Sequence, residues 1–466
     1  MKFPGEVGWG MISYLAEGNR FSSSTARHAG LNLRGRFPVL TAIVALCFLM
    51  AGPAYGASEP AVLHIFGGAN DGSYPYASLS ADGAGNLYGT TQNGGAYGQG
   101  TVFQLSPKAE GGWRFSLVYG FSGAEDGGNP LGGLTFDAAG NAYATVSSGG
   151  IYGLGAVVEL TPPAHPSASR SWSEKALYSF QGGSDGAIPF GNVVLDATGS
   201  LYGTTSIGGV GHIGCPPTKG CGTVYKLSPT KSGVWREQVL HRFTDAFHQG
   251  AEPRAGVVLD AAGNLYGTTY EGGNNLYCNG YGCGSVFELV RPISGKHWRY
   301  VNLIDFDGSN GALLLAGLTI NASGTLFGAT LYGGTYNDGT VFSLSEDSGR
   351  WQLQTLYNFG GLDGLQPAGT LALDEAGNIY GTTYEGGAYD WGEVFQLAPG
   401  GEGWSENVLY NFTVSGKRFG ASPLDGVLLD GAGNLFLTTN QGGNINDCQP
   451  NAGCGTVIEL SSGQKP

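Results

Sequence analysis

Four aspartates recur in one short motif of this 466-residue chain, and carboxylates at a repeated position could attract a cation. The motif is a phenylalanine, then small residues, then Asp-Gly, as in "FSGAEDGGNP" and "FQGGSDGAIP". Its acids are Asp71, Asp126, Asp185 and Asp363, and a fifth copy has Asn310 instead. Asp-Gly is first of all a turn signal, and these acids lack the dense spacing of a calcium loop. We expect turn formers, with a cation-attracting ring as the alternative.

Aromatic residues follow a Gly-Gly pair in several places, where they could stack on sugar rings. They are Tyr97, Tyr152, Tyr336 and Tyr389, with Trp391 beside the last. Packing between neighbouring loops is the first expectation for these side chains, and carbohydrate binding is the second. His212 and His248 fall in neighbouring loops and could act as a pair, although two unsupported histidines are most often surface residues.

Six cysteines fall in three short loops, namely "CPPTKGC" (Cys215, Cys221), "CNGYGC" (Cys278, Cys283) and "CQPNAGC" (Cys448, Cys454). Because cysteine arrives only in pairs and only in a longer loop, three local disulfides are expected, which is typical of an exported protein. The alternative is zinc, with two ligands from each loop. No histidine or second cysteine pair recurs at matching spacing, so no metal site is predicted.

The stretch "DAAGNLYGTTYEGG", from Asp260 to Gly273, combines glycines with two carboxylates and could be part of an active site. However, its centre recurs seven times, at 53 to 64 residues apart, beginning at Gly85, Gly140, Gly199, Gly263, Gly324, Gly377 and Gly433. Periods of this length indicate solenoids, propellers or arrays.

Each repeat holds four apolar runs, exemplified by "GVVLD", "NLYGTT", "GTVFQL" and "WSENVLYNF". The runs have five to nine residues, are rich in β-branched and aromatic residues, and lie between turn residues, which predicts strands. Seven repeats of four antiparallel strands predict an all-β, seven-bladed β-propeller. The last repeat stops after its third run, and residues 61–66 ("AVLHIF") match the missing fourth. This N-terminal strand is therefore expected to complete the last blade and close the ring.

The repeated motif then has a structural interpretation. Asp260 to Gly263 form a turn in which the aspartate bonds its own backbone, and the fifth repeat does the same with Asn321. Gly267 lies inside the second strand, where we expect the neighbouring blade to approach closely. Only the tail, Tyr270 to Gly273, leads into a loop on the face where a ligand could bind.

The seven repeats resemble the Gloeo/Verruco repeat family, whose units carry "GNLYGTT" followed by glycines and "GTVF" much as quoted above. The resemblance covers residues 61 to 461 and implies an exported bacterial protein. It brings no established activity and no catalytic residues.

The composition limits the classes of partner that we expect this protein to bind. The net charge is −14, and the part after residue 57 carries 17 basic and 34 acidic residues, which disfavours nucleic acid and anionic lipid. Within residues 1–57, Arg34 and Arg36, an apolar run and Ala54-Tyr55-Gly56 have the pattern of a secretory signal, and we expect the true start to lie further in than Met1. We expect one propeller domain over residues 58–466 in a secreted, periplasmic or cell-surface protein, monomeric and outside the membrane.

No nucleophile elbow, zinc-protease motif, phosphate loop or dinucleotide fingerprint occurs in the sequence, and no cofactor is predicted. The expected function is non-catalytic binding of a carbohydrate or protein by the loops around the central axis. The alternative is a glycan-cleaving hydrolase or lyase on the same scaffold. An enzyme needs one blade that departs from the pattern, and the third and fourth repeats have the longest loops.

Overall fold

The computed structural model describes residues 60–67, 70–164, 171–209, 215, 220–244, 249–273, 278–294, 297–401, 403–413, 419–444, 448 and 453–462. The predicted signal segment, residues 1–57, lies outside this part, and so do His212 and His248. The described residues belong to one compact unit, Tyr55–Pro466.

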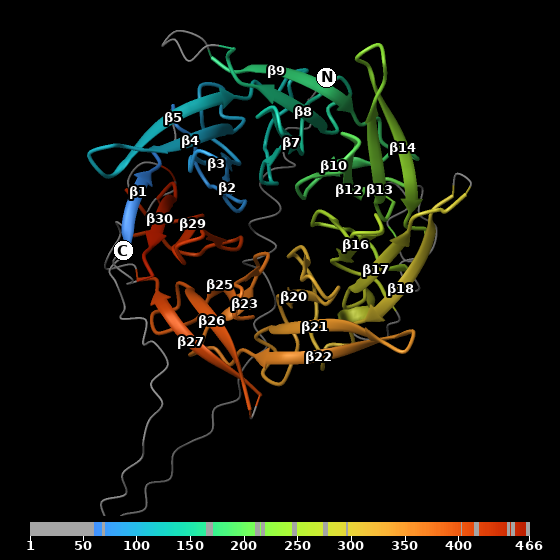
Figure 1. Cartoon of the computed structure of the whole chain (residues 1–466), viewed down its shortest axis with the longest axis vertical. Coiled ribbons are helices and arrows are strands. Elements are labelled where there is room, and N and C mark those ends of the chain that lie inside the picture. Colours follow the sequence, from blue (N-terminus) through green and yellow to red (C-terminus); the bar gives the residue numbers. More distant parts are fainter. Residues whose placement is uncertain are drawn as a thin grey trace, which may run out of the picture. The chain divides into compact units, whose positions relative to one another are not determined.

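The described chain forms seven small antiparallel sheets arranged as the blades of a propeller (Figure 1). Blade 1 contains β2 (Ser80–Ala81), β3 (Leu87–Thr91), β4 (Thr101–Pro107) and β5 (Trp113–Gly120). Blade 2 contains β6 (Thr135–Phe136), β7 (Ala142–Val146), β8 (Ala156–Thr161) and β9 (Ser173–Ser179). Blade 3 contains β10 (Ala187–Pro189), β11 (Val194–Leu195), β12 (Leu201–Ile207), β13 (Thr223–Pro229) and β14 (Trp235–Arg242).

The remaining blades repeat this order from the inner to the outer strand. Blade 4 contains β15 (Val258–Leu259), β16 (Leu265–Thr269), the 3-10 turn η1 (Cys278–Gly280), β17 (Ser285–Val290) and β18 (Arg299–Asp305). Blade 5 contains β19 (Thr319–Ile320), β20 (Leu326–Thr330), β21 (Thr340–Asp347) and β22 (Arg350–Asn358). Blade 6 contains β23 (Leu365–Pro367), β24 (Ala372–Leu373), β25 (Ile379–Glu385), β26 (Glu393–Gly400) and β27 (Gly403–Asn411). Blade 7 contains β28 (Leu428–Leu429), β29 (Leu435–Thr439), β30 (Thr456–Leu460) and β1 (Ala61–Ile65).

Ring closure by the N-terminal strand is confirmed. β1 pairs antiparallel with β30, so the order of blade 7 is β28, β29, β30 and then β1. The amide of Phe66 extends this pairing by donating to the carbonyl of Gly455 at 3.1 Å. The first and last parts of the propeller thus share one sheet, which leaves no unpaired blade edge at the junction.

The phenylalanine that ends each outer strand builds the core between blades. All seven of these rings are fully buried, namely Phe66, Phe121, Phe180, Phe243, Phe306, Phe359 and Phe412. In most interfaces the ring meets an aromatic residue on the third strand of the next blade, as Phe243 meets Phe287 with centroids 5.4 Å apart. The apolar core is therefore a series of contacts between neighbouring blades, which explains why the second strands are buried on both faces.

The prediction that Gly267 meets the neighbouring blade is wrong, because the close neighbour is in its own blade. Gly267 pairs with Phe287 on the adjacent strand, and a Cβ at Gly267 would lie 2.5 Å from the Phe287 Cζ. In blade 2 the paired residues at this register are Ala144 and Val158, and neither side chain has a ring. The glycine therefore makes room for an aromatic ring across the strand.

The predicted turn is confirmed. The Asp260 carboxylate accepts hydrogen bonds from the amide and the side-chain nitrogen of Asn264, both at 2.8 Å, and Gly263 has a φ of +83°. The hydroxyl of Tyr266 also donates to this carboxylate at 3.3 Å. Asn321 accepts the equivalent amide bond from Thr325 at 2.9 Å, so the turn does not require a charge.

The inner strands differ from expectation, because only two residues of each predicted five-residue run pair as a regular strand next to the turn. The preceding residues bend toward the central axis and touch the same segment of the next blade. We call these seven segments the inner collar, and they span 75–79, 130–134, 189–193, 253–257, 314–318, 367–371 and 423–427. Contact is tight, since a Cβ at Gly191 would lie 2.0 Å from the amide nitrogen of Gly256.

Side chains also tie the inner collar together. The first threonine of the "TT" pair donates to a collar carbonyl of the following blade, as Thr268 does to Ala316 at 3.1 Å. At the junction of blades 6, 7 and 1, the Asp425 carboxylate accepts from the amides of Thr370 at 3.1 Å and Ser78 at 2.7 Å. These bonds hold the collar backbone where regular strand pairing is missing.

Candidate functional site

The loops between the second and third strands share one end of the propeller with the loops that connect successive blades. Isolated bridges join the two kinds of loop, for example between Ala251 and Glu271 and between Ala312 and Tyr332. We call this end the loop face. All the candidate residues from the sequence that the structure describes lie on loops of this face.

The four predicted aspartates are anchored within their turns. The Asp126 carboxylate accepts from the Ser122 amide at 2.8 Å and from the Tyr119 hydroxyl at 3.0 Å. Asp185 and Asp363 repeat this arrangement with a tyrosine of the preceding outer strand, whereas Asp71 meets His64 at 3.0 Å. Among the described residues, no group of three or more His, Cys, Asp or Glu side chains could hold a metal ion. The contacts are those of turn formers.

The predicted aromatic residues fall into two groups. The four tyrosines are more than half exposed, with relative exposures of 53 to 65% for Tyr97, Tyr152, Tyr336 and Tyr389. Trp391 is half-buried and packs against the apolar core shared by blades 6 and 7. The tyrosines therefore stay available for stacking, whereas the tryptophan also serves packing.

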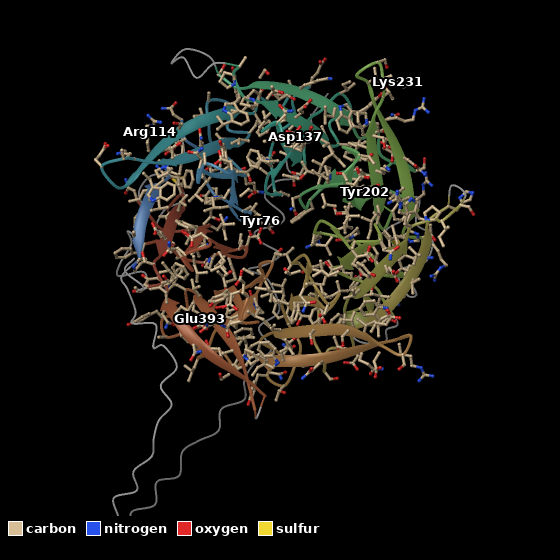
Figure 2. The ribbon with its side chains drawn as sticks, in the orientation of Figure 1. Tyr76, Arg114, Asp137, Tyr202, Lys231 and Glu393 are labelled. Atoms are coloured by element: carbon tan, nitrogen blue, oxygen red, sulfur yellow. A yellow bond between two sulfur atoms is a disulfide. The ribbon has the colours of Figure 1, made fainter. Side chains whose placement is uncertain are left out.

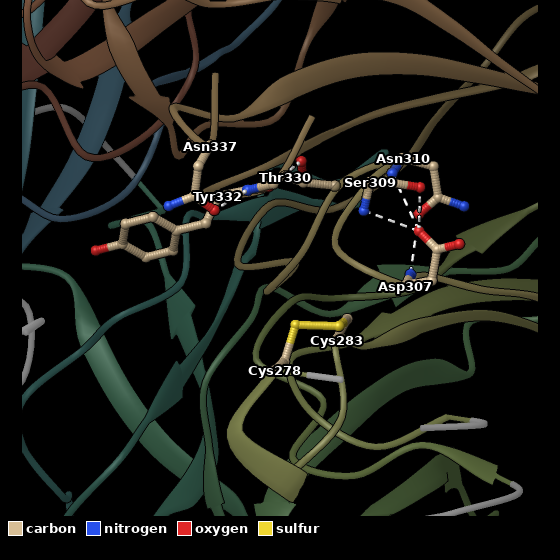
Figure 3. The surroundings of a disulfide bond; sticks show 9 residues. Cys278, Cys283, Asp307, Ser309, Asn310, Thr330, Tyr332 and Asn337 are labelled. Carbon is tan, nitrogen blue, oxygen red and sulfur yellow. Dashed lines mark hydrogen bonds between the residues drawn. A yellow bond between two sulfur atoms is a disulfide. The ribbon is translucent and has the colours of Figure 1, made fainter. Parts of the chain in front are cut away.

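The three predicted disulfides are confirmed as Cys215–Cys221, Cys278–Cys283 and Cys448–Cys454. Figure 3 shows the second of them beside Tyr332 and the turn formed by Asp307, Ser309 and Asn310. Tyr332 and both cysteines belong to one packed cluster. The disulfides therefore fasten loops on the loop face directly to the residues around the axis.

Seven residues at the start of the inner collar have a left-handed backbone. Their φ values are between 52° and 60°, although none is glycine, and they are Tyr74, Asn129, Ile188, Glu252, Leu313, Gln366 and Ser422. Such a conformation costs free energy and persists only where the surroundings impose it.

Here the preceding blade imposes it through a hydrogen bond, as from the Glu252 amide to the Cys221 carbonyl at 2.8 Å. Cys283 and Cys454 provide the same carbonyl for Leu313 and Tyr74. Three of the seven bonds thus end on a disulfide-bonded cysteine.

The second residue of the collar segment is uncharged in six of the seven blades. These six residues are Tyr76, Leu131, Phe190, Leu315, Ala368 and Leu424, and Figure 2 shows Tyr76 near the centre of the ring. Tyr76 and Phe190 pack edge to face across blades 1 and 3 with centroids 5.5 Å apart. The aliphatic members are only 3 to 8% exposed.

Arg254 of blade 4 is the exception among these seven positions. Its Nη2 donates to Glu252 Oε2 at 2.8 Å, and its Cζ lies 3.7 Å from the centre of the Tyr270 ring. Burial alone would lower the pKa of Arg254, but Glu252 and neighbouring groups outweigh it and raise that pKa. The guanidinium is thus charged, paired and stacked.

Blade 4 contributes a further acid next to this pair. Glu271 follows Tyr270 directly, and its backbone pairs with Ala251, beside Glu252. Burial, and then the nearby Glu252 carboxylate, raise the pKa of Glu271 to about 7. The two neighbouring glutamates therefore differ in their surroundings, because Glu252 is paired with Arg254 at 2.8 Å whereas Glu271 forms no ion pair within the described part of the chain.

Three tyrosines of other blades complete the group. Burial raises the pKa of Tyr76. Its hydroxyl also interacts electrostatically with Arg254, Asp425, Tyr270 and Tyr384. The Tyr332 hydroxyl accepts from Gln366 Nε2 at 3.2 Å. We call the whole set the axial cluster, and it consists of Glu252, Arg254, Tyr270, Glu271, Tyr76, Tyr332 and Tyr384.

Sequence reasoning did not single out the axial cluster, although the tail Tyr270-Glu271 was expected to reach this face. An alignment of the collar segments would have revealed it. In that alignment, Glu252 and Arg254 of "EPRAG" in blade 4 occupy the positions of neutral residues in other blades, such as Leu313 and Leu315 in blade 5. Chemically, the cluster offers aromatic faces, hydroxyls, two carboxyl groups and a guanidinium. Such groups suit a sugar.

No helix among the described residues is long and apolar enough to cross a membrane. The family model of the Gloeobacter/Verrucomicrobia repeat matches residues 53–278, 216–372 and 281–464. None of the curated proteins matches the chain.

Several solved structures are similar to this chain. A proposed 6-phosphogluconolactonase from Bacteroides uniformis is 15% identical, with 76% of this chain and 88% of that chain covered and a TM-score of 0.47. The extracellular domain of a proposed one-component system from B. thetaiotaomicron is 9% identical, with 86% of this chain but only 40% of that chain covered and a TM-score of 0.48. A proposed glucose dehydrogenase from Thermus thermophilus is 15% identical, with coverages of 85% and 99% and a TM-score of 0.39. Likeness at this level says nothing about ligand or activity.

Proposed function

Because the chain belongs to the Gloeobacter/Verrucomicrobia repeat family and its repeats form a propeller with one charged blade at the axis, we propose that it is an exported carbohydrate-binding protein without catalytic activity. The ligand binds at the axial cluster on the loop face. Three disulfides and the predicted signal segment support export to an oxidising compartment. An acidic surface fits a monomer without nucleic-acid or membrane partners.

The observation that carries this proposal is the departure of blade 4 from the pattern of the other blades. Glu252, Arg254 and Glu271 place three ionisable groups where the equivalent positions elsewhere are mostly neutral, with Glu385 as the acidic exception. Burying ionisable groups costs free energy that neutral residues avoid, and the protein uses neutral residues at these positions in other blades. Aromatic rings with a few polar groups aimed at one point are typical of ligand sites.

A glycan-cleaving hydrolase is the second candidate, and one observation favours it. Glu252 pairs with Arg254 at 2.8 Å, whereas burial and the Glu252 carboxylate raise the pKa of Glu271 to about 7, and two carboxyl groups in such different surroundings can serve as base and acid. A protein ligand on the exposed tyrosines is the third candidate.

The test uses residues that the protein already places at these positions. In a blade-4 graft, Glu252→Gln, Arg254→Leu, Tyr270→Leu and Glu271→Gln copy Gln366, Leu315, Leu331 and Gln441 of other blades. The matched rim variant replaces Tyr97, Tyr152, Tyr336 and Tyr389 by alanine. Both variants and the parent are applied to a glycan array, and the thermal unfolding of each is measured.

We expect the parent to bind a saccharide, the blade-4 graft to lose this binding while still folded, and the rim variant to keep it. Loss of binding in the rim variant alone would move the ligand to the loop tips. The saccharides bound are also incubated with the protein and assayed for new reducing ends. Cleavage that Glu271→Gln abolishes would replace the binding function by the hydrolase.

A further inference from the structure

The charge around the axial cluster is unevenly distributed. In the second collar position and the two positions after the "TT" pair, Arg254 is the one cation across all seven blades, and every one of these positions is described. Its charge is already neutralised by Glu252 at 2.8 Å, and its flat face is covered by Tyr270. An acidic ligand would therefore compete with Glu252 for this guanidinium, of which the buried Nε has no hydrogen-bond partner in the described structure.

The carboxylates, in contrast, are in excess. The Glu271 carboxyl group accepts no hydrogen bond from the described part of the chain, although its backbone pairs with Ala251. Glu385 occupies the equivalent position in blade 6, and burial and Asp390 raise its pKa. The groups facing Glu271 are Glu252, which repels its charge, and Arg254, which only partly offsets that repulsion. A cation bound beside Glu271 would stabilise its ionised form.

Aromatic rings surround the same place. Tyr270, Tyr332 and Tyr384 come from three consecutive blades, and Tyr332 interacts electrostatically with both of the others. Tyr76 of blade 1 interacts in the same way with Tyr270 and Tyr384. The faces of tyrosine rings attract cations as well as the C–H groups of sugars. The other collar residues offer a ligand little surface, because Leu131, Phe190, Leu315, Ala368 and Leu424 are at most 8% exposed.

We infer that the axial cluster recognises an amino sugar, with the ammonium group of a hexosamine beside Glu271 and among the four tyrosine rings. This inference rests on the proposed carbohydrate-binding function and narrows it to saccharides with a free amine. Acidic sugars are excluded because they would meet uncompensated carboxylates instead of a free guanidinium.

Three probes of equal length separate the alternatives. They are the glucosamine tetramer, the N-acetylglucosamine tetramer and the galacturonic acid tetramer, titrated calorimetrically into the disulfide-bonded protein at about pH 6.5. The first two probes share their backbone and differ in the amine, so their ratio isolates the ammonium charge. We expect the glucosamine tetramer to bind at least about tenfold more tightly than its acetylated form, which corresponds to one charge-assisted contact. The galacturonic acid tetramer should not bind.

A pair of variants locates the contact. Glu271→Gln should weaken glucosamine binding about tenfold and leave the acetylated tetramer unchanged. The control Glu346→Gln removes the same charge from the exposed outer part of β21 and should have no effect on either probe. Proton release on binding, measured in buffers of different ionisation enthalpy, should disappear in Glu271→Gln.

The outcomes are distinct. Equal or tighter binding of the acetylated tetramer, preference for galacturonic acid, or an unaffected Glu271→Gln variant overturns the amino-sugar inference while carbohydrate binding stands. Absence of binding to every saccharide of the glycan array overturns the proposed function and this inference with it.

Discussion

Replacing Glu393 by threonine should stabilise the propeller, and the gain should increase with pH. In five other blades the first residue of the third strand is a threonine or serine, and in blades 1, 3, 4, 5 and 7 its hydroxyl meets a threonine of the second strand at 2.8 to 2.9 Å. Blade 6 has Glu393 there, opposite Thr383. The side chain is 0% exposed, and neither carboxyl oxygen has a hydrogen-bond partner in the described structure.

Burial, and then the Glu406 and Asp363 carboxylates, raise the pKa of Glu393 from 4.5 to about 8. Since the folded state favours the protonated form, the stabilising contribution is fully present below about pH 4.5 and is lost as the pH rises through about 8. At about 1.4 kcal/mol for each pKa unit, the parent should lose about 3 kcal/mol between about pH 5 and about pH 7.5 through this one group. Glu393→Thr and Glu393→Gln have no carboxyl group at this position, so neither variant should show this decrease in the free energy of unfolding with pH.

Guanidinium unfolding of the parent and both variants at the two pH values measures the difference in the free energy of unfolding. The control Glu346→Gln, on an exposed part of β21, should change stability equally at both pH values. A benefit of Glu393→Thr that is the same at the two pH values would refute the reasoning, because a neutral packing defect has no pH dependence. Glu393→Gln separates charge from shape, since it keeps the length of the side chain.

Three further predictions concern the fold. Gly267→Ala should lower the free energy of unfolding by about 1–3 kcal/mol, because its Cβ would lie 2.5 Å from the Phe287 ring. Adding Phe287→Val should restore part of this loss, and additive losses in the double variant would contradict the explanation. Replacing Cys278 and Cys283 by serine should cost about 2 kcal/mol and accelerate hydrogen exchange of the Leu313 amide, with the Asn129 amide unchanged as a cysteine-free control. Deleting residues 61–66 should lower the melting temperature sharply, since β1 completes blade 7, and an unaltered melting curve would count against closure.

The sequence predicts those parts of the fold that depend on neighbouring residues. The Asp260 turn, the cysteine pairs and the outer strands each follow from a few adjacent side chains, and repetition makes their pattern unmistakable. The match between residues 61–66 and the missing fourth strand extends this to ring closure.

The inner collar could not be predicted in the same way. Its backbone is set by contacts with the next blade, such as that of Gly191 with Gly256. The partner of Gly267 was also misjudged, because a glycine in a strand shows that something comes close but not what. The axial cluster is assembled from blades 1, 4, 5 and 6, so no single repeat contains it.

Departures from the repeat are of two kinds, and the difference indicates where to look for function. In blade 2, Val146 and Ala156 replace the hydroxyl pair, and Ala144 and Val158 replace the glycine and its ring, so each change is compensated by its partner. These substitutions preserve packing and need no further cause. Natural proteins depart from local rules without compensation mainly at functional or strained sites.

Two of the uncompensated departures in the described chain introduce carboxyl groups. Glu393 has gained a carboxyl with no partner, and blade 4 has gained Arg254, Glu252 and Glu271 with carboxylate charge left over. Glu393 is completely buried, so it cannot meet a ligand, and its effect should appear in stability alone. The blade-4 residues are about one-fifth exposed at the arginine and at Glu252, so a ligand can reach them. An excess of carboxyl groups therefore costs folding free energy in blade 6 and serves recognition in blade 4. Variants at Glu393 should change unfolding, whereas variants at the blade-4 residues should change ligand binding.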